Sequence, residues 1–340
     1  PPPDSQREEE PKIAGMLVPV LVPMPANGPY SYRVNEGQSV VAGSLVRIPL
    51  GPRTVTGIVW DGEATDELAS AKIRPITSVL PVPPINARLR QFIDWVARYT
   101  MTPPGLIARM AASLPASLPP AKPLINIAPG DTIPDRMTPE RERVLHHAKT
   151  GPIGSKADLA ARSGVTNAVI DGLLKAGALK TVIRPKHQVT VSLDPDHHPP
   201  KLYPAQEKAA QKINATVKKG GYSVTLIDGV TGSGKTEVYF EAIAQTLRAK
   251  KQALVLVPEI SLTAAFLQRF EQRFGGKPGE WHSDITPKRR SDLWRALAEG
   301  TVQVVVGARS ALFLPYKNLG LIIVDEEPDM AYKQEERAIY

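Results

Sequence analysis

The sequence predicts a protein of several domains: a small β-rich domain, a compact helical unit with a wing strand, and an α/β lobe. Short β-branched runs separated by Gly and Pro recur between residues 13 and 82. Residues 135–190 follow the order helix, turn, helix and wing, which is typical of a winged-helix fold. A G-x-x-x-x-G-K-S/T motif at residues 229–236 stands between an apolar run and a helical pattern, as a P-loop requires.

The composition limits the classes of protein that this chain can belong to. Among its 340 residues, 42 Lys and Arg stand against 34 Asp and Glu, and the net charge of +8 favours a polyanionic partner. The chain has no cysteine, so disulfides and cysteine zinc sites are excluded and a reducing cytoplasm is the expected compartment. Its apolar runs fall short of the ~20 residues of a membrane span, so no membrane association is expected.

Changes in composition along the chain give the expected domain boundaries. A charged, proline-rich leader is expected to be disordered, and two further proline-rich stretches are expected to be linkers. The expected organisation is a leader at 1–11, a β-rich domain at 12–112, a linker at 113–134, a winged helix at 135–190, a linker at 191–201 and an α/β lobe at 202–340.

The β-rich domain is predicted from its strand-like runs and one amphipathic helix. The runs occupy residues 17–20, 30–34, 44–48 and 55–60. Leu89, Phe92, Val96 and Tyr99 then share one helical face, and the sequence Pro-Pro-Gly at 103–105 is expected to stop that helix.

The winged-helix prediction depends on start and stop signals. The helix starts are Thr138 with Pro139, Ser155 with Asp158 as a capping box, and Thr166, while Gly164 supplies a tight turn and residues 179–183 the wing strand. The segment 135–190 carries 10 Lys and Arg against 5 Asp and Glu, a net charge of +5. Because the fold does not fix the function, DNA binding and protein docking both remain open for this unit.

The clearest chemical signal is the P-loop, which follows an expected strand at 223–228 and precedes an expected helix at 237–247. Its residues are Gly229, Val230, Thr231, Gly232, Ser233, Gly234, Lys235 and Thr236. Glycines in such a loop let backbone N–H groups point at phosphate oxygens, and the following helix N-terminus favours the same charge. Lys235 is expected near the β- and γ-phosphates of ATP, and the Thr236 hydroxyl is expected to ligate Mg²⁺.

A second apolar strand, residues 321–324, is expected to deliver acidic side chains to the same sheet edge. Asp325 is expected to hold Mg²⁺ through water, and Glu326 to orient or deprotonate the attacking water. Charged strand ends are often simply solvated, and only the combination with Lys235 favours catalysis. Gln206 is a candidate for reading the adenine edge, with a solvated helix glutamine as the alternative.

Two further strands, residues 253–257 and 304–307, complete the expected sheet. Polar residues that follow them are candidates for contacts with a nucleic-acid backbone, with surface solvation as the alternative for each alone. These candidates are Ser261, Thr263, Arg309 and Ser310.

Four segments resemble helicase motifs of the PriA family of replication restart helicases: residues 228–240, 253–263, 304–315 and 322–336. The segments 28–34, 46–53 and 93–105 resemble the 3′-DNA-binding domain of that family. The resemblance implies a 3′-DNA-binding domain, a winged helix and a first RecA-like lobe of an ATP-dependent 3′-to-5′ DNA helicase. It also implies a pocket for a DNA 3′ terminus at Tyr30, Ser31, Gly51 and Arg74.

The resemblance further implies the partners of this chain. Forked and single-stranded DNA are expected to bind, together with single-stranded-DNA-binding protein and other primosome proteins, and the chain is expected to be a monomer. ATP and Mg²⁺ are the expected cofactors, and zinc is expected only in the full-length family. The chain is expected to be an N-terminal fragment that does not unwind DNA alone.

Two residues depart from the family pattern. Ser31 stands where the family usually has Asp, so a weaker hydrogen bond to a 3′-hydroxyl is expected. Pro328 stands where the family has a His that links nucleotide state to DNA grip. Two alternative functions are a non-enzymatic adaptor that binds fork DNA and nucleotide, and a DNA translocase from another branch of superfamily 2.

Overall fold

The structure is a computed structural model, and it divides the chain into two compact units. Unit 1 comprises Pro1–Leu118 and Val189–Tyr340, and unit 2 comprises Pro119–Gln188. The residues that the structure describes are 11–26, 28–64, 73–112, 124–130, 132, 134, 136–150, 154–184, 192–230, 232–258 and 264–326. Nearly all of the expected disordered leader therefore lies outside the described residues.

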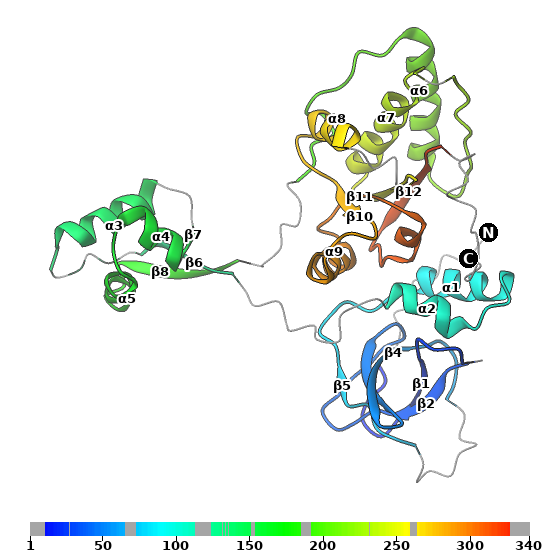
Figure 1. The fold of residues 1–340 in the computed structure, drawn as a ribbon, viewed down its shortest axis with the longest axis horizontal. Coiled ribbons are helices and arrows are strands. Elements are labelled where there is room, and N and C mark those ends of the chain that lie inside the picture. Colours follow the sequence, from blue (N-terminus) through cyan, green and yellow to red (C-terminus); the bar gives the residue numbers. More distant parts are fainter. Residues whose placement is uncertain are drawn as a thin grey trace. The chain divides into compact units, whose positions relative to one another are not determined.

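The N-terminal part of unit 1 is an antiparallel sheet with the strand order β2-β1-β4-β3-β5 (Figure 1). Its strands are β1 (Leu17–Leu21), β2 (Tyr30–Arg33), β3 (Leu45–Leu50), β4 (Arg53–Val59) and β5 (Ser78–Val79). Val20, Ile48 and Ile76 are each fully buried in its core. All four runs that the sequence predicted as strands contribute to this sheet.

Helix α1 (Ala87–Tyr99) packs on the sheet, and helix α2 (Pro104–Ala111) follows it. The Asn86 side chain caps α1 by accepting from the N–H of Leu89. The expectation of one amphipathic face is wrong at Tyr99, which is 74% exposed and stacks on Trp95. Pro104 stands at the first turn of a second helix, where its missing N–H has no cost.

The C-terminal part of unit 1 contains a parallel sheet with the order β10-β11-β9-β12. Its elements are α6 (Pro204–Lys219), α7 (Lys235–Arg248), β9 (Gln252–Leu256), α8 (Ala264–Phe274), β10 (Gly279–Trp281), α9 (Pro287–Glu299), β11 (Val304–Gly307), the 3₁₀ helix η3 (Arg309–Phe313) and β12 (Leu319–Val324). Val255 and Val306 pack with α7 and α8, whereas Leu254 and Val305 pack with α9. The sheet therefore has helices on both faces.

The expected strand at 223–228 is not formed in the structure. Residues 222–230 have no strand assignment and pair with no strand among the described residues. Val224 and Leu226 are 80% and 87% exposed, so neither side chain gains the burial that stabilises a strand. Ile227 alone packs inward, where it contacts the α6–α7 cluster.

Residues 192–201, expected to be a linker, pack against the α/β part of unit 1. Leu193 is buried in the core with α7 and α8. The N–H of Asp194 donates to the carbonyl of Phe274 at 3.0 Å, and Arg273 donates to the carbonyl of Pro195 at 2.9 Å. This stretch is therefore an ordered part of the lobe.

Two parts of unit 1 share one apolar core. The Trp294 Nε1–H donates to the carbonyl of Ala111 at 2.8 Å, and Asn86 Nδ2 donates to the carbonyl of Tyr316 at 2.7 Å. The rings of Phe92 and Phe313 lie 5.3 Å apart. These contacts join α1 and α2 to α9 and η3.

The described residues of unit 2 form three helices and a three-stranded antiparallel sheet with the order β7-β6-β8 (Figure 1). Its elements are β6 (Leu124–Pro129), α3 (Pro139–Thr150), β7 (Gly154–Ser155), α4 (Lys156–Ser163), α5 (Asn167–Lys175) and β8 (Leu179–Arg184). The capping box of Ser155 and Asp158 is formed, and Gly164 takes a left-handed conformation at φ 60°. The expected linker at 113–134 is corrected, because β6 lies within it and pairs with both other strands.

Among the described helices, none combines the length and the apolar character that crossing a bilayer requires.

Candidate nucleotide and nucleic-acid sites

The P-loop leads directly into α7, as the sequence predicts, and glycine is required at two of its positions. Gly232 and Gly234 have φ values of 79° and 81°, which L-residues with a Cβ rarely adopt. A Cβ on Gly234 would also lie 2.2 Å from Nε2 of Gln206. Thr231 lies outside the described residues.

Lys235 and Gln206 both contact the loop itself. Lys235 Nζ donates to the carbonyls of Gly229 at 2.6 Å and Val230 at 3.2 Å. Gln206 Nε2 donates to the carbonyl of Ser233 at 2.8 Å, while its Oε1 accepts from the N–H of Tyr203 at 2.9 Å. Gln206 is therefore a bridge between the start of α6 and the P-loop.

The parallel strands bring three predicted segments to one edge of the sheet. Strand β9 pairs with both β11 and β12 in parallel, so the carboxyl ends of all three strands meet there. Asp325 and Glu326 follow β12 at this edge, and the N–H of Asp325 donates to the carbonyl of Leu256 at 2.9 Å. Glu326 has a positive φ of 52°, a conformation that is uncommon for a residue with a side chain.

A tyrosine that the sequence analysis did not single out joins the P-loop helix to this edge. The hydroxyl of Tyr239 on α7 donates to Oδ2 of Asp325 at 2.8 Å. The Thr236 side chain also acts on the pKa of Tyr239, so Thr236 lies close to this hydroxyl. Tyr239 stands four residues after Lys235, so the two side chains lie on the same face of α7. This spacing is the sequence signal that could have indicated its place beside the P-loop.

The hydroxyl of Tyr239 remains protonated at physiological pH. Burial, and after it the negative charge of Asp325, raises the pKa of Tyr239 far above its ordinary value of 10.0. Tyr239 is therefore a permanent hydrogen-bond donor to the carboxylate.

The side chains at this edge fit Mg²⁺ held together with a nucleotide. Thr236 and Asp325 supply a hydroxyl and a carboxylate, which are oxygen ligands of the kind that Mg²⁺ prefers. Within the described residues, no three His, Asp or Glu side chains gather closely enough to hold a metal by themselves. Mg²⁺ usually binds through one or two carboxylates, substrate phosphates and water, so a protein-only cage is not required.

The candidates for nucleic-acid contact at this edge are only partly described. Arg309 and Ser310 begin η3, directly after β11, and Ser310 Oγ accepts from Trp281 Nε1–H at 3.1 Å. Ser261 and Thr263 lie outside the described residues, as does Pro328.

The residues expected to hold a DNA 3′ terminus lie in the β-rich part of unit 1. Arg74 Nη1 donates to the carbonyl of Gly51 at 3.2 Å, although the two residues are 23 positions apart. Burial raises the pKa of Tyr32, and the charges of Tyr30 and Arg74 also act on it, so both lie near this ring. Ser31 pairs with Pro19 in the sheet, next to Tyr30. Tyr30, Gly51 and Arg74 thus lie near Tyr32, whereas the Ser31 side chain points to the opposite face of β2.

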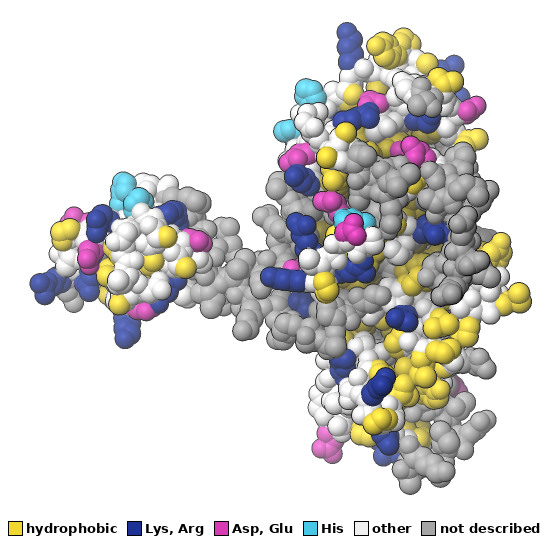
Figure 2. Space-filling view, in the orientation of Figure 1, with side chains coloured by type: hydrophobic (Ala, Val, Ile, Leu, Met, Phe, Trp, Pro, Cys, Tyr) yellow, Lys and Arg dark blue, Asp and Glu magenta, His cyan; other side chains and the backbone are white. Residues whose placement is uncertain are grey.

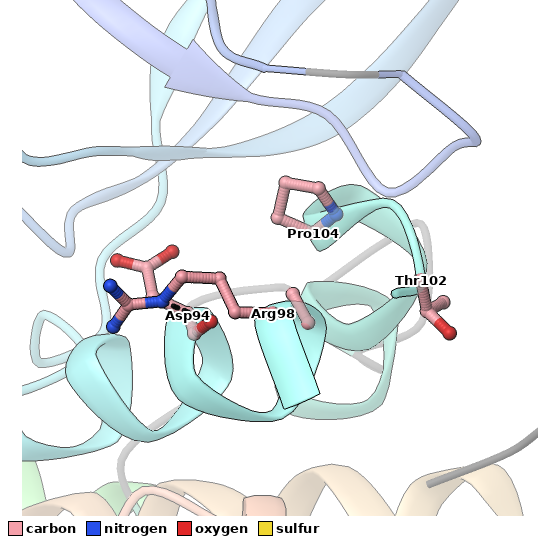
Figure 3. Close-up of a pocket in the computed structure, with 5 residues that line it drawn as sticks. Asp94, Arg98, Thr102 and Pro104 are labelled. Atoms are coloured by element: carbon pink, nitrogen blue, oxygen red, sulfur yellow. Dashed lines mark hydrogen bonds between the residues drawn. The ribbon is translucent and has the colours of Figure 1, made fainter. Parts of the chain in front are cut away.

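A pocket of about 380 Å³ lies at α1 and the start of α2 (Figure 3). It is lined by Asp94, Ala97, Arg98, Thr102 and Pro104. Trp60 Nε1–H donates to Asp94 at 3.3 Å, yet burial raises the pKa of this carboxyl. None of the predicted site residues lines the pocket.

Two known families match the chain, one for the β-rich part of unit 1 and one for its α/β part. Residues 19–113 match the family described as 3′DNA-binding domain (3′BD), which covers the antiparallel sheet with α1 and α2. Residues 203–340 match the DEAD/DEAH box helicase family, which covers the α/β part.

Curated relatives match most of the chain. The replication restart protein PriA of Rickettsia conorii is 30% identical over 325 residues, covering 95% of this chain and 39% of the relative. The protein of the same name from Haemophilus influenzae is 30% identical over 335 residues, covering 94% and 45%. That of Bacillus subtilis is 39% identical over 212 residues, covering 60% and 26%. The chain thus spans less than half the length of these relatives.

Proposed function

The chain belongs to the PriA family of replication restart proteins, and we propose that it forms the DNA-binding and ATP-binding part of a 3′-to-5′ DNA helicase. The observation that carries this proposal is the hydrogen bond from Tyr239 to Asp325. It joins the helix that follows the P-loop to the acidic end of β12, so the two motifs of a nucleotide site converge.

The nucleotide site acts through positioning and charge. The N–H groups of residues 229–236 and the N-terminus of α7 bind phosphate oxygens, and Lys235 adds a cation beside the transferred phosphoryl group. Thr236 would hold Mg²⁺ directly and Asp325 would hold it through water, and the ion would supply positive charge beside the phosphates. Glu326 orients the attacking water and accepts its proton. Gln206, whose amide also hydrogen bonds to Ser233 and Tyr203, reads the adenine edge of the nucleotide.

DNA binding is assigned to three regions. Tyr30, Ser31, Gly51 and Arg74 receive a 3′ terminus, which the match to a 3′DNA-binding family supports. Arg309 and Ser310, with Ser261 and Thr263, contact the backbone of a single strand at the sheet edge. Unit 2 is a winged helix, supported by its three helices and its sheet β7-β6-β8. Its net charge of +5 over residues 135–190 favours DNA over protein as its partner.

Family membership also supports the biological setting. The proposed substrates are stalled forks in the cytoplasm, and the proposed protein partners are single-stranded-DNA-binding protein and other primosome components. A monomer is proposed for this chain. Residues 1–340 by themselves bind both ligands without unwinding DNA.

The test of this function is a pair of titrations with Lys235→Ala. Its affinity for a non-hydrolysable ATP analogue with Mg²⁺ should fall by about tenfold or more, because a charge-assisted contact worth ~1.5–3 kcal/mol is lost. Its affinity for forked DNA should stay unchanged, because the proposed fork-binding regions lie elsewhere. The control is Lys212→Ala, which removes an exposed lysine from α6. Equal affinity of all three proteins for the analogue would refute the nucleotide site.

A further inference from the structure

Tyr239 is a buried polar side chain on α7, the helix that follows the P-loop. It is 3% exposed and lies on the face of α7 that also bears Lys235. A buried phenol hydroxyl normally has a hydrogen-bond partner, but a backbone carbonyl would serve for structure alone. Tyr316 shows this case, since its hydroxyl donates to the carbonyl of Ala311 at 3.1 Å.

Tyr239 instead donates to a side chain that lies 86 positions away in the sequence. Its acceptor is Oδ2 of Asp325, at 2.8 Å. The other carboxylate oxygen, Oδ1, accepts from the N–H of Glu326 at 3.0 Å. Both oxygens of Asp325 are therefore held, and its carboxylate has a fixed orientation at the end of β12.

The ring of Tyr239 is held as firmly as its hydroxyl. It meets the ring of Phe240 edge-on, with centroids 5.4 Å apart, and it belongs to the core that includes Val255 and Phe270. The Thr236 side chain lies close to the same hydroxyl. One rigid side chain thus stands beside both residues that are proposed to face Mg²⁺, one from each motif.

We infer that Tyr239 is a positioning residue for Mg²⁺, whose hydroxyl fixes the Asp325 carboxylate opposite Thr236. This inference rests on the proposed function, because it assigns Mg²⁺-nucleotide to that site. Groups that hydrogen bond to metal-binding carboxylates fix their orientation, so that binding does not have to order them. Tyr239 itself contacts neither the nucleotide nor the metal.

The experiment is Tyr239→Phe, which removes one oxygen and keeps the ring. The measured quantity is the Mg²⁺ concentration that gives half of the metal-dependent gain in affinity for a non-hydrolysable ATP analogue. This concentration should rise on the order of tenfold, because outer partners of metal ligands typically contribute 10–100-fold to metal affinity. Affinity for the analogue in EDTA should stay unchanged.

Two controls separate positioning from a general effect on folding. Tyr316→Phe removes a buried hydroxyl that donates to the carbonyl of Ala311 and not to Asp325. The Mg²⁺ concentration that gives half of the gain in affinity should stay unchanged in this variant. Asp325→Asn should reduce Mg²⁺ dependence, and adding Tyr239→Phe to it should cause little further loss, because the two side chains act as one unit. A thermal melt without ligand checks that each variant is folded.

The outcomes distinguish this inference from the proposed function. If the wild-type protein binds the analogue equally with and without Mg²⁺, the proposed site fails and the inference fails with it. If the wild-type protein depends on Mg²⁺ and folded Tyr239→Phe matches Tyr316→Phe, only the inference is overturned. The inference would also be overturned if Tyr239→Phe and Asp325→Asn had additive effects on Mg²⁺ dependence, because additive effects mean that the two side chains act separately.

Discussion

At the scale of single residues, one glycine of the P-loop, Gly234, lies against the side chain of Gln206 on helix α6. Gly234 has a φ of 81°, and the space where a Cβ would stand is occupied by the amide of Gln206. That amide donates to Ser233 within the loop. Glycine at this position therefore serves both backbone conformation and the contact between α6 and the loop.

Replacing Gly234 by Ala should weaken nucleotide binding. The added Cβ displaces the Gln206 amide and removes a hydrogen bond worth about 1 kcal/mol, and the left-handed conformation costs a further ~1–2 kcal/mol. Affinity for an ATP analogue should fall by about tenfold or more, since each factor of ten corresponds to about 1.4 kcal/mol. A fluorescence titration checks this.

The matched control is Gly221→Ala. Gly221 has a similar φ of 78°, but a Cβ there would meet nothing within 4 Å. It should lower the unfolding midpoint by a similar amount while leaving nucleotide affinity unchanged. Equal affinities of the two variants for the analogue would show that the contact with Gln206 has no role in binding.

At the scale of elements, unit 2 begins earlier in the chain than its helices suggest. Strand β6 is the middle strand of its sheet, with partners β7 and β8 on its two edges. Figure 2 shows Lys and Arg side chains distributed over the visible face of this unit, with Asp and Glu side chains between them. A clean removal of the unit must therefore include β6.

Deleting residues 119–188 should give a folded protein whose DNA affinity is less sensitive to salt. Each phosphate neutralised by Lys or Arg adds to the slope of log affinity against log salt concentration. The deletion removes all of the local +5 charge, so the slope should become shallower. Binding to forked DNA is measured at several salt concentrations.

Deleting residues 135–190 is the comparison for that experiment. It would leave β6 without its two neighbours, and an unpaired strand promotes aggregation. An unchanged salt slope after the 119–188 deletion would instead indicate that unit 2 docks protein.

At the scale of the whole molecule, unit 1 joins the β-rich part to the α/β part through a common core. Trp294 of α9 is 1% exposed and donates to Ala111 at the end of α2. The described residues contain one parallel sheet of the nucleotide-binding kind. The proposed helicase activity needs two such lobes, which close and open against each other.

A preparation of residues 1–340 alone should therefore bind forked DNA and nucleotide without separating strands. An arginine finger from an opposing lobe is typically worth ~10³ to 10⁵ in rate, so ATP turnover should be very slow. A strand-displacement assay with Mg²⁺-ATP, run beside a fork-binding titration, measures both properties. Unwinding that Lys235→Ala abolishes would contradict this prediction.

Residues close together in the chain were enough to predict the helix after the P-loop, the strands that precede Asp325 and Arg309, and the capping box of unit 2. Residues 223–228 show where such local patterns fail, since a strand also needs a partner and a buried face, whereas this segment has no strand partner among the described residues and only Ile227 is partly buried. Only the tertiary structure decided the place of β6 and the hydrogen bond between Tyr239 and Asp325. The physical reason is that strand pairing and side-chain hydrogen bonds join residues far apart in sequence, for which residue spacing holds no signal.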